Sequence, residues 1–334
     1  MRVTRETLLK LARDFVAQRT RSDRTLLGIF LQGSLLEDES LLGGITDLDL
    51  FLVHSDSVPQ EREILRISDE IHMDVAHHAR SQYRQTRELR GHPWMGDCIN
   101  GGKILYDPQH FLDFTQASVR GQFNRQDHVL LRSRSRLDLA RQIWLAHHEV
   151  NPGELGAQAV ADYLRALENA ANAIAGLSGV PLTERRFLQR FPARALAVRK
   201  PGLTAGLLGL LGAPQVDGEQ IRGWLPAWQA DYRSSDPEGL PVRLHPDRFF
   251  YYLRGIEALL SSPSPQDALW PLLRTWAALA SRPSVKSAPS EGWLNALSSL
   301  GLVGDGFAER IEALDAYLDT IEELLEDWGR EHGA

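Results

Sequence analysis

Residues 31–53 read LQGSLLEDESLLGGITDLDLFLV, and this stretch decides the fold that we expect. It joins two runs of strand-forming residues, 25–32 and 47–55, through a polar loop that contains glycine. Asp47 and Asp49 lie two residues apart in the second run, so their side chains leave the same face of a strand, separated by roughly 7 Å. The leucines that alternate with them mark the opposite face as buried. The stretch therefore predicts a half-buried strand with two carboxylates on one face.

A third carboxylate follows in the next strand-like run. Asp74 is centred in HMDVAHHA, residues 72–79, where a neighbouring strand would deliver it beside Asp47 and Asp49. An isolated Asp-x-Asp pair is ordinary at a solvent-exposed strand end. Three converging carboxylates repel one another unless cations neutralise them, and hard oxygen ligands of this kind suit Mg²⁺. The trio therefore indicates a site for two magnesium ions of the type used in phosphoryl or nucleotidyl transfer.

Gly33 and Ser34 directly follow the first strand. In a turn at the end of that strand, backbone N–H groups can point at an anion, and glycine permits its close approach. The serine hydroxyl can donate to a phosphate oxygen. A single Gly-Ser pair carries little information, so its value here comes from its order and spacing relative to the aspartates.

The remaining pattern divides the chain into two parts. Up to residue 109 helices and strands are mixed, whereas helical periodicity dominates from residue 110 onward. We expect an α+β protein with a small mixed β-sheet catalytic domain, residues 1–109, followed by an all-α helical domain, residues 110–334. Within the first part the patterns predict helices over 5–18, 60–71 and 80–89, and a short strand in GGKILYDP, residues 101–108.

Composition limits the partners of the protein. The 334 residues contain 44 acidic and 37 basic side chains, and the net charge of −7 disfavours general binding to nucleic acid or an anionic membrane. No window contains the roughly 18 consecutive apolar residues of a membrane helix. Cys98 is the only cysteine, so no internal disulfide forms, and we expect a cytoplasmic protein.

The order LQGS, twelve residues, DLDLFLV and then HMDVAH resembles the nucleotidyltransferase superfamily, which has a DNA polymerase beta-like fold and includes kanamycin-type and minimal nucleotidyltransferases. The resemblance covers residues 25–108. It implies that Gly33 and Ser34 hold the triphosphate of a nucleotide, most simply ATP. It also implies that Asp47 and Asp49 bind both magnesium ions, and that Asp74 completes the second metal position and helps to activate an acceptor hydroxyl.

Two features depart from the pattern of that superfamily. Glu37, Asp38 and Glu39 lie near the expected nucleotide, where relatives often have a small or basic residue after the serine. Acids pointing at the triphosphate would oppose its binding, although charge runs usually face solvent. Thr46 stands where a serine often precedes the first aspartate, which keeps the hydroxyl.

The acceptor side is less specific. Glu168 is a candidate general base, with a solvated helix carboxylate as its ordinary alternative. Arg185 and Arg186 are candidates for phosphate contact, with a surface ion pair as the alternative. His78 shares the facing of Asp74 by strand parity and is a candidate for lining the site. The basic run RSRSR, residues 132–136, splits across two faces of a helix and is interpreted as a solvated flank rather than a nucleic-acid groove.

These observations predict a magnesium-dependent nucleotidyltransferase. It would transfer a nucleoside monophosphate from a nucleoside triphosphate to a hydroxyl of a small molecule held between the two halves of the chain, with release of pyrophosphate. One alternative keeps the chemistry but makes a protein hydroxyl the acceptor, as in toxin–antitoxin relatives. A second alternative is a catalytically silent module that binds nucleotides or partner proteins, in which the acidic loop has impaired turnover.

Overall fold

The computed structural model describes residues 4–37, 39–55, 57–58, 60–149, 156–236, 240–282 and 289–334. The chain forms two compact units, of which the first contains Met1–His128 together with Asp247–Gly255. The second contains Val129–Pro246 and Ile256–Ala334. The expected α+β class, with a small mixed sheet followed by a helical region, is confirmed. The boundary between the units lies after His128 rather than at residue 109, and a short distant segment returns to the first unit.

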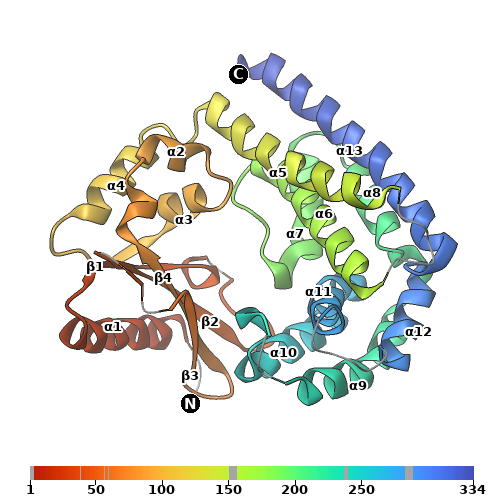
Figure 1. The fold of residues 1–334 in the computed structure, drawn as a ribbon, viewed down its shortest axis with the longest axis horizontal. Coiled ribbons are helices and arrows are strands. Elements are labelled where there is room, and N and C mark those ends of the chain that lie inside the picture. Colours follow the sequence, from red (N-terminus) through yellow and green to blue (C-terminus); the bar gives the residue numbers. More distant parts are fainter. Residues whose placement is uncertain are drawn as a thin grey trace. The chain divides into compact units, whose positions relative to one another are not determined.

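The first unit is built on one five-stranded sheet with the order β3-β4-β2-β1-β5. The central strand β2 pairs antiparallel with β1 and parallel with β4, while β3 and β5 form the edges of the sheet. Figure 1 shows helix α1 on one side of this sheet and helices α2, α3 and α4 on the other. The strands are β1 (Leu26–Gln32), β2 (Thr46–His54), β3 (Arg62–Arg66), β4 (Ile71–Ala79) and β5 (Lys103–Tyr106).

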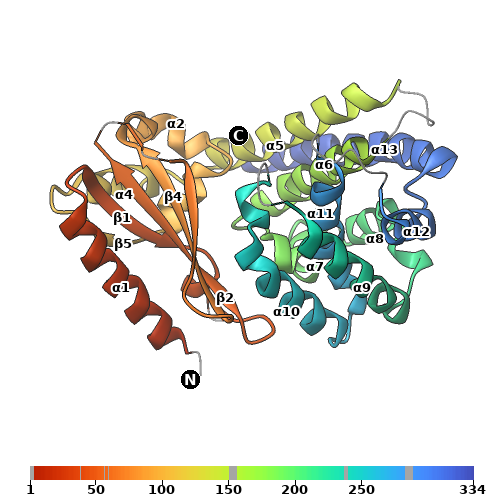
Figure 2. The same ribbon diagram turned by 60° about the horizontal axis from the view of Figure 1, so that its bottom comes forward.

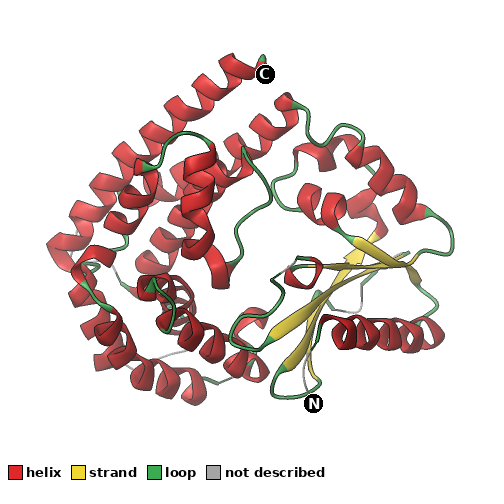
Figure 3. Cartoon of the chain, turned by 180° about the vertical axis from the view of Figure 1, so that it is seen from behind, coloured by secondary structure: helices red, strands yellow, loops and turns green. Residues whose placement is uncertain are grey.

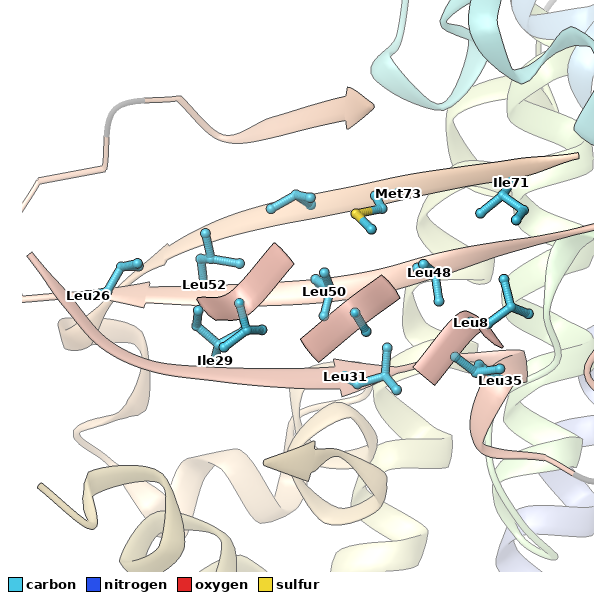
Figure 4. Close-up of a cluster of buried hydrophobic side chains, with 13 residues drawn as sticks. Leu8, Leu26, Ile29, Leu31, Leu35, Leu48, Leu50, Leu52, Ile71 and Met73 are labelled. Carbon is cyan, nitrogen blue, oxygen red and sulfur yellow. The ribbon is translucent and has the colours of Figure 1, made fainter. Parts of the chain in front are cut away.

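Helix α1 (Arg5–Ser22) covers the aliphatic face of the sheet, as Figure 2 also shows. It begins at the N-cap Thr4, whose side chain accepts a hydrogen bond from the amide of Thr7. Alternate residues of the central strands point toward it, and Figure 4 shows Leu48, Leu50 and Leu52 of β2 beside side chains of β1 and β4. Leu50 is fully buried in this cluster. The strand period of two thus separates an aliphatic face from the face that carries the aspartates.

The opposite face of the sheet is covered by α2 (Thr86–Gly91), α3 (Met95–Gly101) and α4 (Phe111–Arg120). Leu89, Ile99 and Leu112 of these helices pack with Phe30 and Val53 of the sheet. This packing explains why the first unit extends beyond residue 109, because α4 buries its apolar stripe against the sheet.

One helix that the sequence pattern predicts is not formed. The sequence pattern predicts a helix over residues 60–71, but Arg62–Arg66 form the edge strand β3, which pairs antiparallel with β4. The local sequence is rich in glutamate, arginine and leucine, which favour helices, and pairing with an available strand edge overrides that preference. The expected helix over 80–89 is divided into a 3-10 turn, Arg80–Tyr83, and the short helix α2.

All regular secondary structure in the described residues of the second unit is helical, as Figure 3 shows. Its interior contains the fully buried side chains of Trp228, Trp270, Trp276 and Trp293. No helix in the described part of the chain combines the length and the hydrophobicity needed to cross a bilayer. The helices of this region are α5 (Gln126–His147), α6 (Ala157–Gly176), α7 (Phe187–Ala197), α8 (Gly202–Leu210), α9 (Gly218–Ser234), α10 (Phe249–Leu260), α11 (Leu269–Ala280), α12 (Glu291–Leu300) and α13 (Gly304–His332), of which α5 and α10 begin within the first unit.

The basic run at 132–136 is not a solvated flank. Arg132 and Arg136 are buried, and only Arg134 is exposed. The expected division of the run across two helix faces is present, because residues four apart share a face in α5. The face shared by Arg132 and Arg136 is turned inward, however, so these two arginines do not form a basic surface.

Candidate functional site

The three aspartates meet because β2 and β4 are parallel neighbours in register. Asp49 is the direct partner of Asp74 across these strands, and Asp47 lies two residues earlier on the same face of β2. One carboxylate oxygen from each residue can be chosen such that all three lie within 4.8 Å of one another. Asp47 and Asp74 are each only 3% exposed. The structure therefore gathers three acidic groups in one largely buried place, which we call the aspartate triad.

The turn after β1 is built around the triad. Gly33 directly follows Gln32, the residue of β1 that pairs with Asp49 of β2. Gly33 has a positive φ of 85°. A Cβ atom on Gly33 would lie 1.8 Å from Oδ2 of Asp49, so this position has no room for a side chain. Ser34 begins a short 3-10 turn, and its Oγ lies 3.0 Å from Oγ1 of Thr46. Thr46 thus keeps a hydroxyl beside Ser34.

Two arginines neutralise part of the triad. Arg62 on β3 donates to both oxygens of Asp74, at 2.5 Å from Nε and 2.7 Å from Nη2. Arg248 bridges two aspartates, because its Nη2 donates to Oδ2 of Asp47 at 2.9 Å and its Nη1 donates to Asp74. The site therefore combines three carboxylates with two guanidinium groups.

Asp49 is the least compensated member of the triad. Burial raises the pKa of its carboxyl group well above the usual value, and the neighbouring charges of Asp47 and Asp74 raise it further. The opposing effects of Arg248 and Arg62 are smaller. Within the described part of the chain no hydrogen bond to the Asp49 carboxylate is present. Its oxygens are therefore available to an added cation.

The donor set fits Mg²⁺, which prefers carboxylate oxygens and commonly binds through one or two of them. Asp49 offers uncommitted oxygens, whereas Asp74 and one oxygen of Asp47 are engaged by arginines. A cation at the triad would thus be held first by Asp49 and Asp47. Full use of Asp74 would require an arginine to change its partner.

Arg248 is a residue of the site that the sequence did not reveal. It ends the 3-10 turn Pro246–Arg248, immediately before α10, and its sequence distance from Asp47 is 201 residues. Its guanidinium carbon lies 4.6 Å from the ring centre of Tyr251 and 5.7 Å from that of Tyr252. The only local signal is an arginine placed before the aromatic run FFYY. Such a signal does not identify the anion with which the arginine pairs.

The other residues predicted for the site lie in both units of the chain. His78 shares the face of Asp74 but lies four residues further along β4, where its Nδ1 is 2.6 Å from the hydroxyl of Tyr83. Glu168 belongs to the second unit and forms a 2.6 Å ion pair with Arg274. Arg185 and Arg186 are also in the second unit, where both are buried. Their surface exposure, which the ion-pair alternative required, is therefore absent.

The acidic loop after Ser34 is described only in part, because Asp38 lies outside the described residues. Glu37 is half-buried and Glu39 is exposed. Exposure of Glu39 agrees with the interpretation that this charge faces solvent.

Comparison with known proteins adds no assignment. No protein-family model matches the chain, and no curated protein matches its sequence. The resemblance to nucleotidyltransferases therefore rests on the motif residues between 31 and 77, and the geometry of the triad is the basis for any functional proposal.

Gly33→Ala is expected to weaken divalent-cation binding at least about tenfold, because the new Cβ would displace the Asp49 carboxylate. Gly44→Ala is the matched control, since Gly44 also has a positive φ, 76°, but has no atom within 4 Å of the added Cβ. Backbone strain is expected to cost each variant about 1–3 kcal/mol of stability, and Gly33→Ala should lose more because its φ of 85° and ψ of −166° are adopted almost only by glycine. Calorimetric titration with Mn²⁺ compares them, and equal affinities in the two variants would show that Gly33 does not support the site.

His78→Gln is expected to reduce the acid sensitivity of folding. Burial, followed by the charges of Arg62 and His77, lowers the pKa of His78 to about 4. Neutral His78 therefore contributes stability that is present above the unfolded pKa near 6.5 and is lost as the pH falls toward about 4. Between about pH 7 and about pH 5, the loss of unfolding free energy should be smaller in the variant by roughly 1–2 kcal/mol.

Urea unfolding at the two pH values measures this difference. His110→Gln is the control, because His110 is exposed and its hydrogen bond to Asp113 raises rather than lowers its pKa. A His78→Gln protein that loses as much stability in acid as the wild type would disprove the assignment of a neutral, half-buried His78.

Proposed function

We propose that the protein is a magnesium-dependent nucleotidyltransferase that acts at the aspartate triad. The observation that carries this proposal is the meeting of Asp47, Asp49 and Asp74 beside the Gly33–Ser34 turn, with ligand atoms from the three residues within 4.8 Å of one another. Three carboxylates in one buried place are unfavourable for the fold alone, because like charges raise the cost of burying each other. Binding of divalent cations and a polyanionic substrate would offset this cost and would give the clustered carboxylates a function.

The residues of the chain would divide the chemistry among them. When bound, magnesium supplies electrostatic stabilisation of the attacking and leaving oxygens in the transfer step. Asp47 and Asp49 hold the metal positions, and the backbone and hydroxyl groups of Gly33 and Ser34 bind the triphosphate. Asp74 completes the second position and accepts the proton of the acceptor hydroxyl as that oxygen attacks the α-phosphorus. Pyrophosphate leaves, and no covalent intermediate with the protein is needed.

The acceptor proposed is a small hydroxylated molecule. The excess of 44 acidic over 37 basic side chains, and the burial of Arg132 and Arg136, argue against a sustained basic surface for nucleic acid. Glu168, Arg185 and Arg186 belong to the second unit, and their role on the acceptor side stays a prediction from the sequence. The nucleotide proposed is ATP.

Asp49→Asn is expected to reduce Mg²⁺-dependent ATP binding at least about tenfold, because it removes the carboxylate with uncommitted oxygens. Calorimetry with and without Mg²⁺ measures the effect. The variant should unfold at no lower temperature than the wild type in the absence of metal, since the substitution removes one of three mutually repelling charges. Asp14→Asn, on the exposed face of α1, is the control. Undiminished metal-dependent binding in Asp49→Asn would refute the assignment of the site.

The transfer reaction is tested with α-labelled ATP, CTP, GTP or UTP in a cell lysate containing Mg²⁺ and the protein. Label is expected in small molecules, and it should be absent with Asp47→Asn but present with Asp14→Asn. Label found chiefly on polypeptide would replace the small-molecule acceptor by a protein hydroxyl. Failure of the wild type to transfer label to any fraction would favour a silent binding module.

A further inference from the structure

We infer that Arg248 is the resident cation of the aspartate triad, which divalent metal displaces, and that the displaced guanidinium then binds a phosphate of the nucleotide. This inference rests on the proposed function for the identity of the phosphate, but not for the competition with metal. Arg248 thus pairs with carboxylates of the triad when no metal is bound, and with a phosphate of the nucleotide when metal is bound.

Competition follows from the atoms that Arg248 occupies. Its Nη2 lies 2.9 Å from Oδ2 of Asp47, and its Nη1 donates to Oδ2 of Asp74. These are carboxylate oxygens of two of the three residues whose ligand atoms can surround one cation. A metal ion bound to those oxygens would lie beside the guanidinium group, and the repulsion between the two positive charges disfavours joint occupancy. Binding of a metal to Oδ2 of Asp47 or of Asp74 therefore requires Arg248 to withdraw.

The need for a second anion follows from burial. Arg248 is only 6% exposed, so a guanidinium that loses its carboxylates without gaining another partner would be an uncompensated buried charge. Removing one partner of a buried ion pair commonly costs about 3–5 kcal/mol. A phosphate oxygen arriving with the metal would supply the lost partner, and guanidinium groups suit phosphate because their N–H groups form a planar fork.

The surroundings of Arg248 are suited to such an exchange. The rings of Tyr251 and Tyr252 lie beside its guanidinium and favour a cation at this place through their π faces. Its Nε is buried and has no hydrogen-bond partner among the described residues. One donor of the fork is thus already available before any carboxylate is released.

Arg62 differs from Arg248 in its exposure to solvent. Its side chain is 44% exposed and, among the described residues, pairs with Asp74 alone, so water can solvate it if that pair is broken. Arg248 is buried and bridges two aspartates. Arg62 is therefore the matched control, because its loss removes the same charge from the same carboxylate without removing a buried phosphate ligand.

Charge balance supports coupled entry of metal and nucleotide. With all three carboxylates ionised, the three aspartates and the two arginines together carry one net negative charge. Two divalent cations would reverse this to three net positive charges if both arginines stayed nearby. That excess favours a triphosphate, whose negative charge balances metals and arginines together.

The experiment compares Arg248→Met, Arg248→Lys and Arg62→Met in two titrations. Mn²⁺ is titrated without nucleotide, and α,β-methylene-ATP is then titrated at saturating Mg²⁺. Arg248→Met is expected to bind Mn²⁺ about tenfold more tightly than the wild type, and the nucleotide analogue about tenfold more weakly. Arg62→Met is expected to gain Mn²⁺ affinity but to lose less than about threefold in nucleotide affinity. Arg248→Lys keeps the charge but has one donor nitrogen in place of the two that contact Asp47 and Asp74, so it should be intermediate in both titrations.

Opposite signs in the two titrations separate this role from a structural one. If Arg248→Met or Arg248→Lys binds Mn²⁺ no more tightly than the wild type, competition is overturned. If nucleotide binding weakens equally in Arg248→Met and Arg62→Met, the phosphate role is overturned. Should Arg248→Met fail to fold, as judged by thermal unfolding, Arg248→Lys decides both points.

The same titrations separate failure of this inference from failure of the proposed function. A wild type that binds Mn²⁺ but not the nucleotide analogue would refute the nucleotidyltransferase proposal and the phosphate role together. Tighter Mn²⁺ binding by Arg248→Met in that case would still support competition between the guanidinium and metal.

Discussion

The parallel pairing of β2 with β4 is the constraint on which the site depends. It sets Asp49 directly beside Asp74, and the strand period of two brings Asp47 onto the same face. The same pairing turns the leucines of β2 toward α1, where they form the aliphatic core. The register that places the acids on one face therefore also buries the core, and a shift by one residue would exchange the two faces.

Burial of three like charges makes neutralisation a structural requirement. Arg62 meets part of it from the neighbouring strand β3, and Arg248 meets another part from a segment far along the chain. The segment Asp247–Gly255 thereby belongs to the first unit, although the surrounding sequence belongs to the second. Electrostatic compensation is thus one reason why this unit is discontinuous in sequence, since a buried aspartate pair without a cation would be strongly destabilising.

The glycine at position 33 shows how tightly the backbone surrounds the triad. Its positive φ and the short approach to Asp49 leave no space for a Cβ atom. The turn and the acidic face are therefore parts of one arrangement rather than neighbouring motifs. This relation gives the Gly-Ser pair a physical meaning that its composition alone does not have, because the turn lies against one of the three carboxylates that could hold a metal ion.

The sequence by itself determined the features that depend on local periodicity. Alternation in β2 and β4 identified the acidic and aliphatic faces, and helical spacing identified α1 and the helical nature of the second part. Prediction from local periodicity failed for β3, because Arg62–Arg66 have helix-favouring residues but pair with β4. Strand pairing depends on a partner strand, which local propensity does not describe.

Only the tertiary structure decided how the charges of the site are balanced. The spacing of Asp47 and Asp49 indicated a shared face, but nothing near them in sequence indicated Arg248. The tertiary structure also decided that Arg132 and Arg136 are buried, although their sequence resembles a solvated basic run. Periodicity tells which side chains share a face, whereas the packing of distant segments decides what that face meets and therefore which charges are paired.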